Sequence, residues 1–458
     1  MLTIGEFSSI CRVSTKTLRY YAEIGLILPE EINPENGYRY YSINQLETML
    51  FINRLKAYHF SLEEIKAILE SEEAMDDKLY AALSKKKKEI SMQMFIFSAD
   101  IMCAGQTSKR LLNFIGSFVR HLPGGLAVTT GATCTLFGAI SGSTQATVVA
   151  VGKPMRKEML EKGYDDEDVI GLIINAANIA LLIPPSVIMI MYCVVTGTSV
   201  AELFIAGIGP GIVLFILFAI YSVFRAKMKG TPREPKATWG ERWVAFKQAI
   251  IPLGFPLIIL GGIYSGIFSP TESAAVSVLY AVIVEAFVYK TIRLRDVPTI
   301  AKSTGILTAA IFILVACGQV FSWVISYAQI PQLLTSAILG DAPSQLQVLV
   351  CVTIFFMIGC MFADQLVVIL ILTPIFYPIA IAAGVDPIHL GLIISVQCAI
   401  GSATPPFGCN IFTASAIFNT PYLKVIKGVP AYIICSAIAS VLFILVPQTA
   451  MFFYNLVY

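Results

Sequence analysis

Two short stretches of hydroxyl and glycine residues lie within long apolar segments, and a third apolar segment contains a carboxylate. The sequence Ser-Gly-Ser occupies residues 141–143, Gly-Ser-Ala-Thr occupies residues 401–404, and the carboxylate belongs to Asp364. Hydroxyl and carboxylate oxygens suit a hard cation such as Na⁺, and glycine lets the backbone come close to an ion. An ionisable residue deep in an apolar segment is a candidate functional residue. Together these residues predict a cation site in an apolar setting.

A Pro-Pro pair accompanies each stretch, Pro184-Pro185 in the first case and Pro405-Pro406 in the second. Because proline interrupts a helix, free helix ends are expected there, with amide donors for an anion and carbonyl acceptors for a cation. The predicted ion- and substrate-binding residues are Ser141, Gly142, Ser143, Pro184, Asp364, Gly401, Thr404 and Pro405. Two simpler interpretations stay open: small residues that only allow close helix packing, and Asp364 as a helix N-cap.

The elements that must position these residues occur twice in the sequence. A shift of 221 residues, which is 405 minus 184, aligns the two Pro-Pro pairs and also pairs Gly138 with Gly359. The loop inside the first copy carries Lys153, Arg156, Lys157 and Lys162. The equivalent loop, residues 380–388, has neither Lys nor Arg. Since cytoplasmic loops are enriched in Lys and Arg, the copies should face opposite ways. Inverted repeats with interrupted helices are typical of secondary transporters.

The composition indicates a membrane protein with a more polar beginning. The chain is 56% hydrophobic and 14% charged, whereas soluble domains carry about 25% charged residues. Apolar segments long enough to cross a bilayer are residues 202–224, 249–268, 273–289, 304–327, 345–363 and 430–453, and polar or Pro/Gly interruptions occur in 124–152, 169–197, 366–383 and 388–418. The Lys- and Arg-rich segments 225–247 and 290–302 predict cytoplasmic loops.

Other chemistry is not indicated by the sequence. The ten cysteines are scattered without a C-x-x-C pair, which favours apolar packing over zinc or disulfides. No catalytic constellation is predicted, so the chain is not expected to be an enzyme. No secretory signal opens the chain, and the N-terminal part is therefore expected in the cytoplasm.

The first 75 residues have the pattern of a helix-turn-helix. Ile4, Phe7 and Ile10 have helical spacing, Ser14 is a good N-cap, and a second helix is predicted from Thr15 to about residue 24. Lys16 and Arg19 would face DNA while Leu18 and Tyr21 face the core. After a turn at 33–37, Tyr38 and Arg39 suit a wing on the phosphate backbone, and helices are predicted at 43–57 and 61–71. Such a pattern also occurs in domains that never bind DNA.

The motifs "STKTLRYYAEIGLILP" and "NGYRYYS" make residues 2–70 resemble the DNA-binding domain of MerR-family regulators. The resemblance implies that Thr15, Lys16 and Arg19 contact the major groove or its phosphates, that Tyr38 and Arg39 form the wing, and that the domain dimerises on duplex DNA. Members of this family continue into a long dimerisation helix and then an effector domain or metal-binding cysteines. Here residues 75–94 predict at most one amphipathic helix, and Cys11 is the only cysteine before residue 95, so the sequence departs from the family after residue 75.

The motifs "LLIPPSVIMIMY", "GGIYSGIFSPTESAAVS" and "GSATPPFGCNIF" make residues 95–458 similar to the large membrane subunit of tripartite ATP-independent periplasmic (TRAP) transporters. The resemblance implies an elevator-type importer of organic acids, such as dicarboxylates or sialic acid, in the inner membrane. It implies Na⁺ as the coupling ion and no other metal or cofactor. It also implies two partners, a small membrane subunit and a soluble substrate-binding protein.

The predicted fold is mainly α: a winged helix-turn-helix at 1–75, a linker helix at 76–94, and a polytopic membrane domain with inverted repeats and re-entrant hairpins at 95–458. The apolar run 92–105 is short for a membrane span, so this domain is expected to lack the first spans of its family. Two alternatives stay open, a membrane-tethered MerR-type regulator and a non-functional gene fusion.

Overall fold

The computed structural model describes residues 1–34, 37–57, 60, 62–70, 75–330, 339–340 and 343–457. The chain divides into two compact units, Met1–Lys87 and Lys88–Tyr458. Helix α5 (Met75–Cys103) begins in the first unit and ends in the second, so the predicted linker helix and the apolar run that follows it form one continuous helix.

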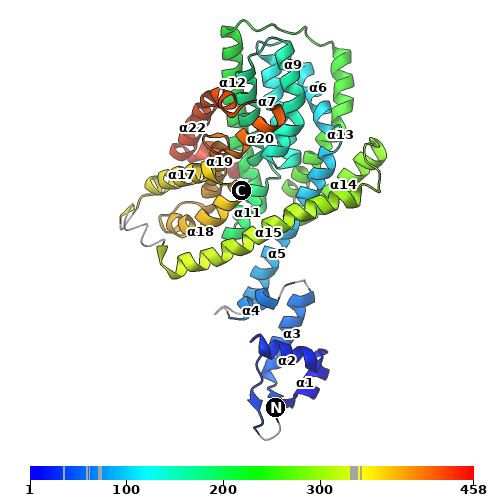
Figure 1. Cartoon of the computed structure of the whole chain (residues 1–458), viewed down its shortest axis with the longest axis vertical. Helices are drawn as coiled ribbons and strands as arrows, with labels where there is room; N and C mark the ends of the chain where they lie inside the picture. The colour runs from blue at the N-terminus through cyan, green and yellow to red at the C-terminus, as the bar shows by residue number, and fades with distance from the viewer. Residues whose placement is uncertain are drawn as a thin grey trace. The chain divides into compact units, whose positions relative to one another are not determined.

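The N-terminal unit is a small helical domain with a three-stranded sheet. Its elements are β1 (Leu2–Thr3), α1 (Ile4–Cys11), α2 (Thr15–Glu23), β2 (Glu31–Ile32), β3 (Arg39–Tyr41), α3 (Asn44–Ala57) and α4 (Leu62–Glu70) (Figure 1). The sheet has the antiparallel order β1-β3-β2, with Leu2 opposite Tyr41 and Ile32 opposite Arg39. The Phe7 and Tyr41 rings stack in its core with centroids 4.6 Å apart.

The predicted helices of this unit are confirmed. Helix α2 begins after Ser14, whose hydroxyl accepts a hydrogen bond from the Thr17 amide, and its Leu18 and Tyr21 are buried as predicted. One detail differs in α1, where Cys11 is buried and Ile10 is exposed. A buried face formed by positions 4, 7 and 11 has the i, i+3, i+7 spacing of a straight helix.

The membrane unit begins with the last part of α5 and is almost entirely helical. Its first half contains α6 (Thr107–Val119), α7 (Gly125–Ser141), α8 (Thr144–Thr147), η1 (Val148–Gly152), α9 (Lys153–Glu161), α10 (Asp166–Ala177), η2 (Asn178–Leu181), α11 (Val187–Thr196) and α12 (Val200–Met228). Its second half contains α13 (Trp239–Tyr264), α14 (Pro270–Val282), η3 (Ile283–Val288), α15 (Val297–Tyr327), α17 (Gln345–Phe362), α18 (Gln365–Ala382), α19 (Pro387–Ala403), α20 (Cys409–Phe418), α21 (Tyr422–Lys427), α22 (Pro430–Leu445), α23 (Pro447–Ala450) and α24 (Phe452–Val457).

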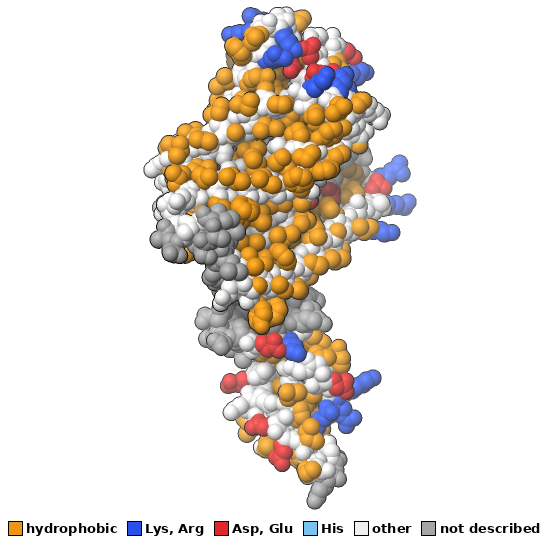
Figure 2. Space-filling view, turned by 60° about the vertical axis from the view of Figure 1, so that its left-hand side comes forward, with side chains coloured by type: hydrophobic (Ala, Val, Ile, Leu, Met, Phe, Trp, Pro, Cys, Tyr) orange, Lys and Arg blue, Asp and Glu red, His pale blue; other side chains and the backbone are white. Residues whose placement is uncertain are grey.

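Within the described residues, six helices are long and apolar enough to cross a membrane. They are Val200–Met228, Trp239–Tyr264, Pro270–Val288, Val297–Ile325, Gln345–Phe362 and Gln365–Ala382. Figure 2 shows apolar side chains over a broad lateral surface of this unit, with many charged side chains gathered at one end. Apolar surface of this extent faces lipid in membrane proteins.

Two predictions about the helices are wrong. The span 430–453 is not one helix, because α22 ends at Leu445 before Pro447, where proline begins the short helix α23. The segment 366–383 is not interrupted, because α18 continues through Pro374 and Pro378. Proline within a helix is tolerated at membrane depth when neighbouring groups satisfy the freed carbonyls.

The same order of elements occurs twice in the membrane unit. In the first copy α7 and α8 meet at a tip, residues 142–143, and the broken helix α10–η2–α11 follows. In the second copy α17 and α18 meet at a tip, residues 363–364, and the broken helix α19–α20 follows (Figure 1). The Pro184-Pro185 and Pro405-Pro406 bonds are both cis and lie in the breaks of these two helices.

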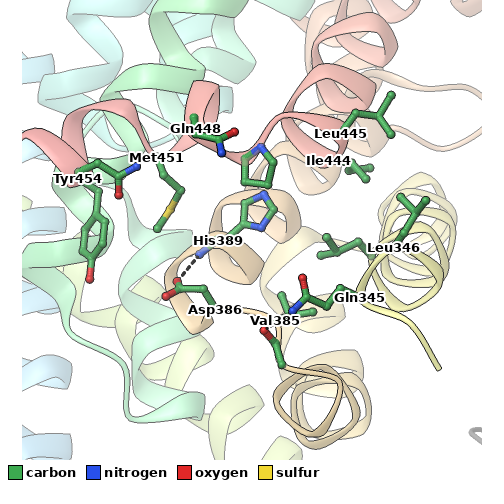
Figure 3. A pocket seen from close by; sticks show the side chains of 14 residues that line it. Gln345, Leu346, Val385, Asp386, His389, Ile444, Leu445, Gln448, Met451 and Tyr454 are labelled. Carbon is green, nitrogen blue, oxygen red and sulfur yellow. Dashed lines mark hydrogen bonds between the residues drawn. The ribbon is translucent and has the colours of Figure 1, made fainter. Parts of the chain in front are cut away.

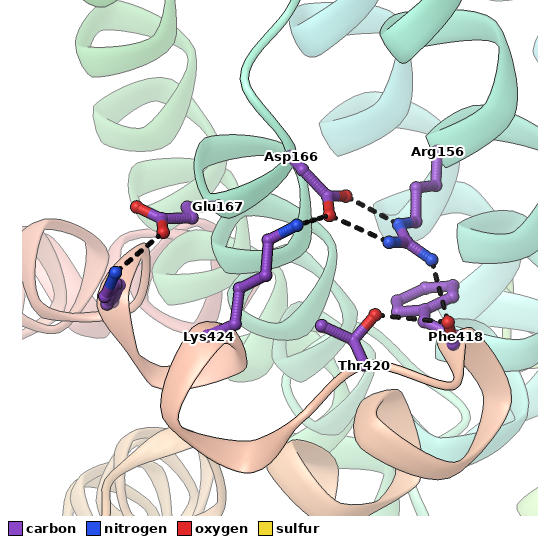
Figure 4. A network of polar contacts seen from close by, with 7 residues as sticks. Arg156, Asp166, Glu167, Phe418, Thr420 and Lys424 are labelled. Atoms are coloured by element: carbon purple, nitrogen blue, oxygen red, sulfur yellow. Dashed lines mark hydrogen bonds and ion pairs between the residues drawn. The ribbon is translucent and has the colours of Figure 1, made fainter.

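A network of ion pairs marks one end of the membrane unit (Figure 4). Asp166, at the start of α10, accepts hydrogen bonds from Arg156 Nε at 2.7 Å and Nη2 at 2.8 Å, and Lys424 Nζ lies 2.6 Å from its carboxylate. The Arg156 guanidinium beside it lowers the pKa of the Asp166 carboxyl. Further pairs join Glu167 to Lys427 and Asp168 to Arg225, so the two copies and the end of α12 are tied together.

Lys88 lies at the opposite end of α12. Its ammonium donates to three backbone carbonyls that close α11, those of Cys193 at 2.9 Å, Gly197 at 3.0 Å and Thr198 at 2.9 Å. Carbonyls at a helix C-terminus have no partner within the helix and carry partial negative charge. Lys88 therefore fixes the first turn of the membrane unit to the end of α11.

Candidate functional site

The first tip is held against the first helix break. Gly142 ends α7 in the left-handed conformation, with φ of 58°, and a Cβ added there would come within 2.7 Å of the Pro185 carbonyl oxygen. Only glycine allows this approach without strain. The Ser141 hydroxyl lies 3.0 Å from the Thr147 hydroxyl, and Ser143 is the N-cap of α8. The structure thus brings Ser141, Gly142 and Ser143 together with the break that contains Pro184.

At the second tip, as at the first, a side chain caps the N-terminus of the following helix, but here the capping residue is charged. Asp364 is the N-cap of α18, and its carboxylate accepts a hydrogen bond from the Leu366 amide at 3.0 Å. The adjacent Gln365 donates to the Cys409 sulfur at 3.3 Å, at the start of α20. Asp364 is the one charged residue in the described tips and breaks, residues 141–147, 182–187, 363–366 and 404–410. The capping interpretation and a cation-binding role are compatible, because one carboxylate oxygen stays available.

The second break packs on the helix that leads to the second tip. A Cβ added at Gly401 would lie 2.5 Å from Cys360 Cβ and 2.7 Å from the Met357 carbonyl oxygen, so α19 and α17 touch closely there. Thr404 ends α19 and donates its hydroxyl to the Ile400 carbonyl at 2.7 Å. Pro405 follows directly in the break. Gly401 thus serves close packing, whereas Thr404 keeps its hydroxyl oxygen as an acceptor.

Buried amides that sequence reasoning missed connect the two copies. Asn410 Nδ2 donates to Asn178 Oδ1 at 2.5 Å, and Ser402 Oγ donates to the same oxygen at 2.9 Å. Thr144 Oγ1 donates to Asn410 Oδ1 at 2.9 Å. All four side chains are buried. An amide in an otherwise apolar segment is a detectable signal, because burying it requires a partner, but the sequence does not say which residue is the partner.

The two tips and the two breaks surround a set of hydroxyl, amide and carboxylate groups. Helix α8 begins at the first tip and helix α18 at the second. Helix N-termini attract an anionic group, while hydroxyl, carbonyl and carboxylate oxygens can surround a cation. These donor and acceptor types are the ones that a ligand carboxylate and a monovalent cation require. No histidine–cysteine–carboxylate cluster suited to a metal ion occurs among the residues that the structure describes.

A separate pocket of about 550 Å³ lies at the other end of α19 (Figure 3). Asp386 caps α19 by accepting hydrogen bonds from the Ile388 and His389 amides, and His389 Nε2 lies 3.0 Å from the Phe443 carbonyl oxygen. Gln345, Gln448, Tyr454 and Asn455 are further polar residues of the lining. Because α19 runs from this pocket to its break, the pocket is distinct from the site at the tips.

The predicted DNA-binding residues lie on α2 and on β3 or just before it. Thr15, Lys16 and Arg19 are exposed on α2, and Tyr38 is exposed just before β3. Arg39 is half-buried, and its Nη1 atom is buried without a hydrogen-bond partner. The helix therefore presents two basic side chains to solvent, as recognition in a major groove requires.

The broken helices of the membrane unit and the helix-turn-helix of the N-terminal unit agree with the two protein families that the sequence matches. The chain matches the family described as "Tripartite ATP-independent periplasmic transporter, DctM component" over residues 45–449. It therefore belongs to this family of TRAP transporter large permease subunits, which are transporters and not enzymes. Residues 2–72 match the "MerR HTH family regulatory protein" family, so the chain also carries a MerR helix-turn-helix domain at its N-terminus.

Two curated relatives are more than half identical to it. The ectoine TRAP transporter large permease protein TeaC of Halomonas elongata is 55% identical over 369 residues, covering 81% of this chain and 86% of the relative. The ectoine/5-hydroxyectoine large permease UehC of Ruegeria pomeroyi is 53% identical with the same coverage. The C4-dicarboxylate permease DctM of Pseudomonas aeruginosa is 36% identical, covering 79% of this chain and 85% of the relative.

A solved structure has the same fold. The crystal structure of the Alcanivorax borkumensis YdaH transporter superimposes with a TM-score of 0.58, covering 96% of this chain and 97% of that one, at 14% identity. At this identity the similarity concerns the fold alone. The chain is thus a mainly helical, multi-pass membrane protein with an N-terminal helix-turn-helix region. Membership of the TRAP large permease family implies two partners, a small subunit and a binding protein.

Proposed function

We propose that this chain is the large permease subunit of an importer for ectoine or a closely related zwitterion. The observation that carries the proposal is the difference in identity, 55% and 53% to two ectoine permeases against 36% to a dicarboxylate permease. This favours ectoine over the dicarboxylate or sialic acid that the sequence motifs implied. The substrate would be delivered by the binding protein, and the small subunit would complete the membrane complex.

We further propose that the two copies are inverted repeats whose tips form re-entrant hairpins, and that Na⁺ and substrate bind between them. Ser141, Gly142, Ser143 and Pro184 would form one half of the site, and Asp364, Gly401, Thr404 and Pro405 the other. The contact between Gly142 and Pro185 and the contact between Gln365 and Cys409 support it, because each joins a tip to its break. The carboxylate of Asp364 would supply the charged ligand for the cation.

The test is uptake into proteoliposomes that contain the full chain, the small subunit and the binding protein. Ectoine uptake should depend on a Na⁺ gradient, and unlabelled succinate should compete poorly. Asp364→Ala should raise the half-saturating Na⁺ concentration about 5- to 150-fold, since removing a charged ligand removes on the order of 1–3 kcal/mol. Ile216→Ala, an exposed apolar residue on α12, is the control. Uptake driven equally well without Na⁺ would contradict the coupling ion, and preferred succinate uptake would contradict the substrate.

A second candidate function, DNA binding, is favoured by the basic side chains exposed on α2. We propose that residues 1–75 form a winged helix-turn-helix domain, residues 76–94 a linker helix and residues 95–458 the permease domain. Lys16 and Arg19 would contact phosphates, with Tyr38 and Arg39 as the wing. The solubilised full chain should bind duplex DNA with an affinity that falls steeply with salt. Arg19→Ala should weaken it for all sequences, whereas Arg54→Ala on α3 should not; equal binding by wild type and Arg19→Ala would exclude this interface.

A further inference from the structure

Three buried hydrogen bonds join the first tip to both broken helices, and a part-buried bond from a neighbouring residue reaches the second tip. This chain of hydrogen bonds runs from Thr144 at the first tip to Asn410 in α20, and from Asn410 to Asn178 in the first broken helix. From Asn178 it reaches Ser402 near the end of α19. The residue before Asn410 extends it to the second tip, because Cys409 accepts a hydrogen bond from Gln365. The first turn of α20 therefore contacts both tips through adjacent residues.

The two polar atoms of the Asn410 amide have different roles in this chain of hydrogen bonds. Asn410 uses its oxygen as an acceptor toward the first tip and its nitrogen as a donor toward Asn178. Both asparagines are buried, and a buried polar group that loses its partner costs about 1–3 kcal/mol. A displacement of Thr144 would leave the Asn410 oxygen without this donor, so Asn410 and its partner Asn178 would have to move with the tip.

We propose that Asn178 and Asn410 are positioning residues that couple the two halves of the transport site, so that occupation of one tip changes the affinity at the other. The inference rests on the proposed function, since it assigns to these residues the linkage between bound cation and substrate. Neither residue needs to touch the ligand for this role. Coupling between two sites through a physical network is a free energy that both sites share.

The chain offers a matched control one helical turn away. Asn175 is buried in α10, as Asn178 is buried at the start of η2, but its amide donates only to the Gly171 carbonyl of its own helix at 2.9 Å. Asn175→Ala and Asn178→Ala therefore remove the same group from nearly the same depth. Only Asn178→Ala and Asn410→Ala interrupt the connection between the copies.

The experiment is a Na⁺ titration of ectoine uptake by the full complex in proteoliposomes. In the wild type the Hill coefficient for Na⁺ should exceed 1. Asn178→Ala and Asn410→Ala should lower it to about 1 and raise the half-saturating Na⁺ concentration about tenfold, with Asn175→Ala close to wild type. A merely structural role would reduce the amount of folded protein and leave the Hill coefficient unchanged. An unchanged Hill coefficient in both variants, or a wild-type coefficient of 1, would overturn the proposal.

A second measurement separates this inference from the proposed function. Amide hydrogen exchange on the purified chain requires no transport. Thr144→Val should increase exchange near Ser402, although among the described residues the Thr144 hydroxyl bonds only to Asn410, and the Ser402 hydroxyl only to Asn178 and its own helix. If wild type takes up no ectoine, the proposed function fails, and the exchange result still decides the coupling. Unchanged exchange around residues 399–404 in Thr144→Val would refute it.

Discussion

At the residue scale, Asp166 shows how one carboxylate holds several segments together. It lies between Arg156 and Lys424, on segments far apart in the sequence, and its side chain is 16% exposed. The hydrogen bonds from Arg156 hold the pKa of this carboxyl below its usual value near 3.8. Because the folded-state pKa is depressed, the stabilisation is present above about pH 4 and is lost as pH falls through the folded-state pKa.

We therefore expect the melting temperature of the detergent-solubilised chain to decrease when the pH is lowered below about 4. In Asp166→Asn the melting temperature should depend less on pH. At pH 7 Asp166→Asn should itself be destabilised, because Arg156 loses its carboxylate partner. Glu167→Gln is the comparison, since its pair with Lys427 is largely solvent-exposed and should contribute little. If the melting temperatures of wild type and Asp166→Asn changed with pH in the same way between pH 3 and 7, the ion pair would contribute nothing to the pH dependence.

At the element scale, glycine decides whether the first tip can close on its break. Gly142→Ala should lower stability by about 1–2 kcal/mol from the left-handed conformation alone, and further because the new methyl group would meet the Pro185 carbonyl. Gly163→Ala has the same kind of backbone, with φ of 81°, and open space around it. Thermal melts should therefore show a larger loss for Gly142→Ala, and ectoine uptake should fall only there. Equal losses would mean that the close approach is unimportant.

The same scale shows what sequence could and could not predict. The Pro-Pro pairs and the shift of 221 residues predicted both broken helices, because proline interrupts a helix at its own position and can be recognised in the sequence. The segment with Pro374 and Pro378 looked similar in sequence, yet α18 is continuous there, so proline alone does not predict a break in a membrane helix. The pairing of Asn178 with Asn410 could not be predicted, since it depends on how two segments 232 residues apart meet in space.

At the scale of the whole molecule, α12 separates two ends of different charge. One end carries the ion pairs of Asp166, Asp168 and Arg225, and the segments there are the predicted cytoplasmic loops. At 1.5 Å per residue, the 29 residues of α12 span about 43 Å, more than the ~30 Å of hydrocarbon. Helix α12 is therefore long enough to reach from the end with the ion pairs to the opposite surface of a membrane, where we expect Gly197 and Thr198.

The contact of Lys88 with this opposite end sets the side from which the chain enters the permease fold. If the basic loops are cytoplasmic, Lys88 lies at the external surface, beside the three carbonyls to which it donates. In a chain otherwise free of cysteine, Thr198→Cys should react with an impermeant maleimide from outside, and Arg233→Cys only after permeabilisation. Protection of both positions in intact cells would mean that the two ends of α12 do not lie at opposite surfaces of the membrane. With Lys88 at the external surface, the permease unit would begin on the side of the membrane where we propose that the binding protein delivers the substrate.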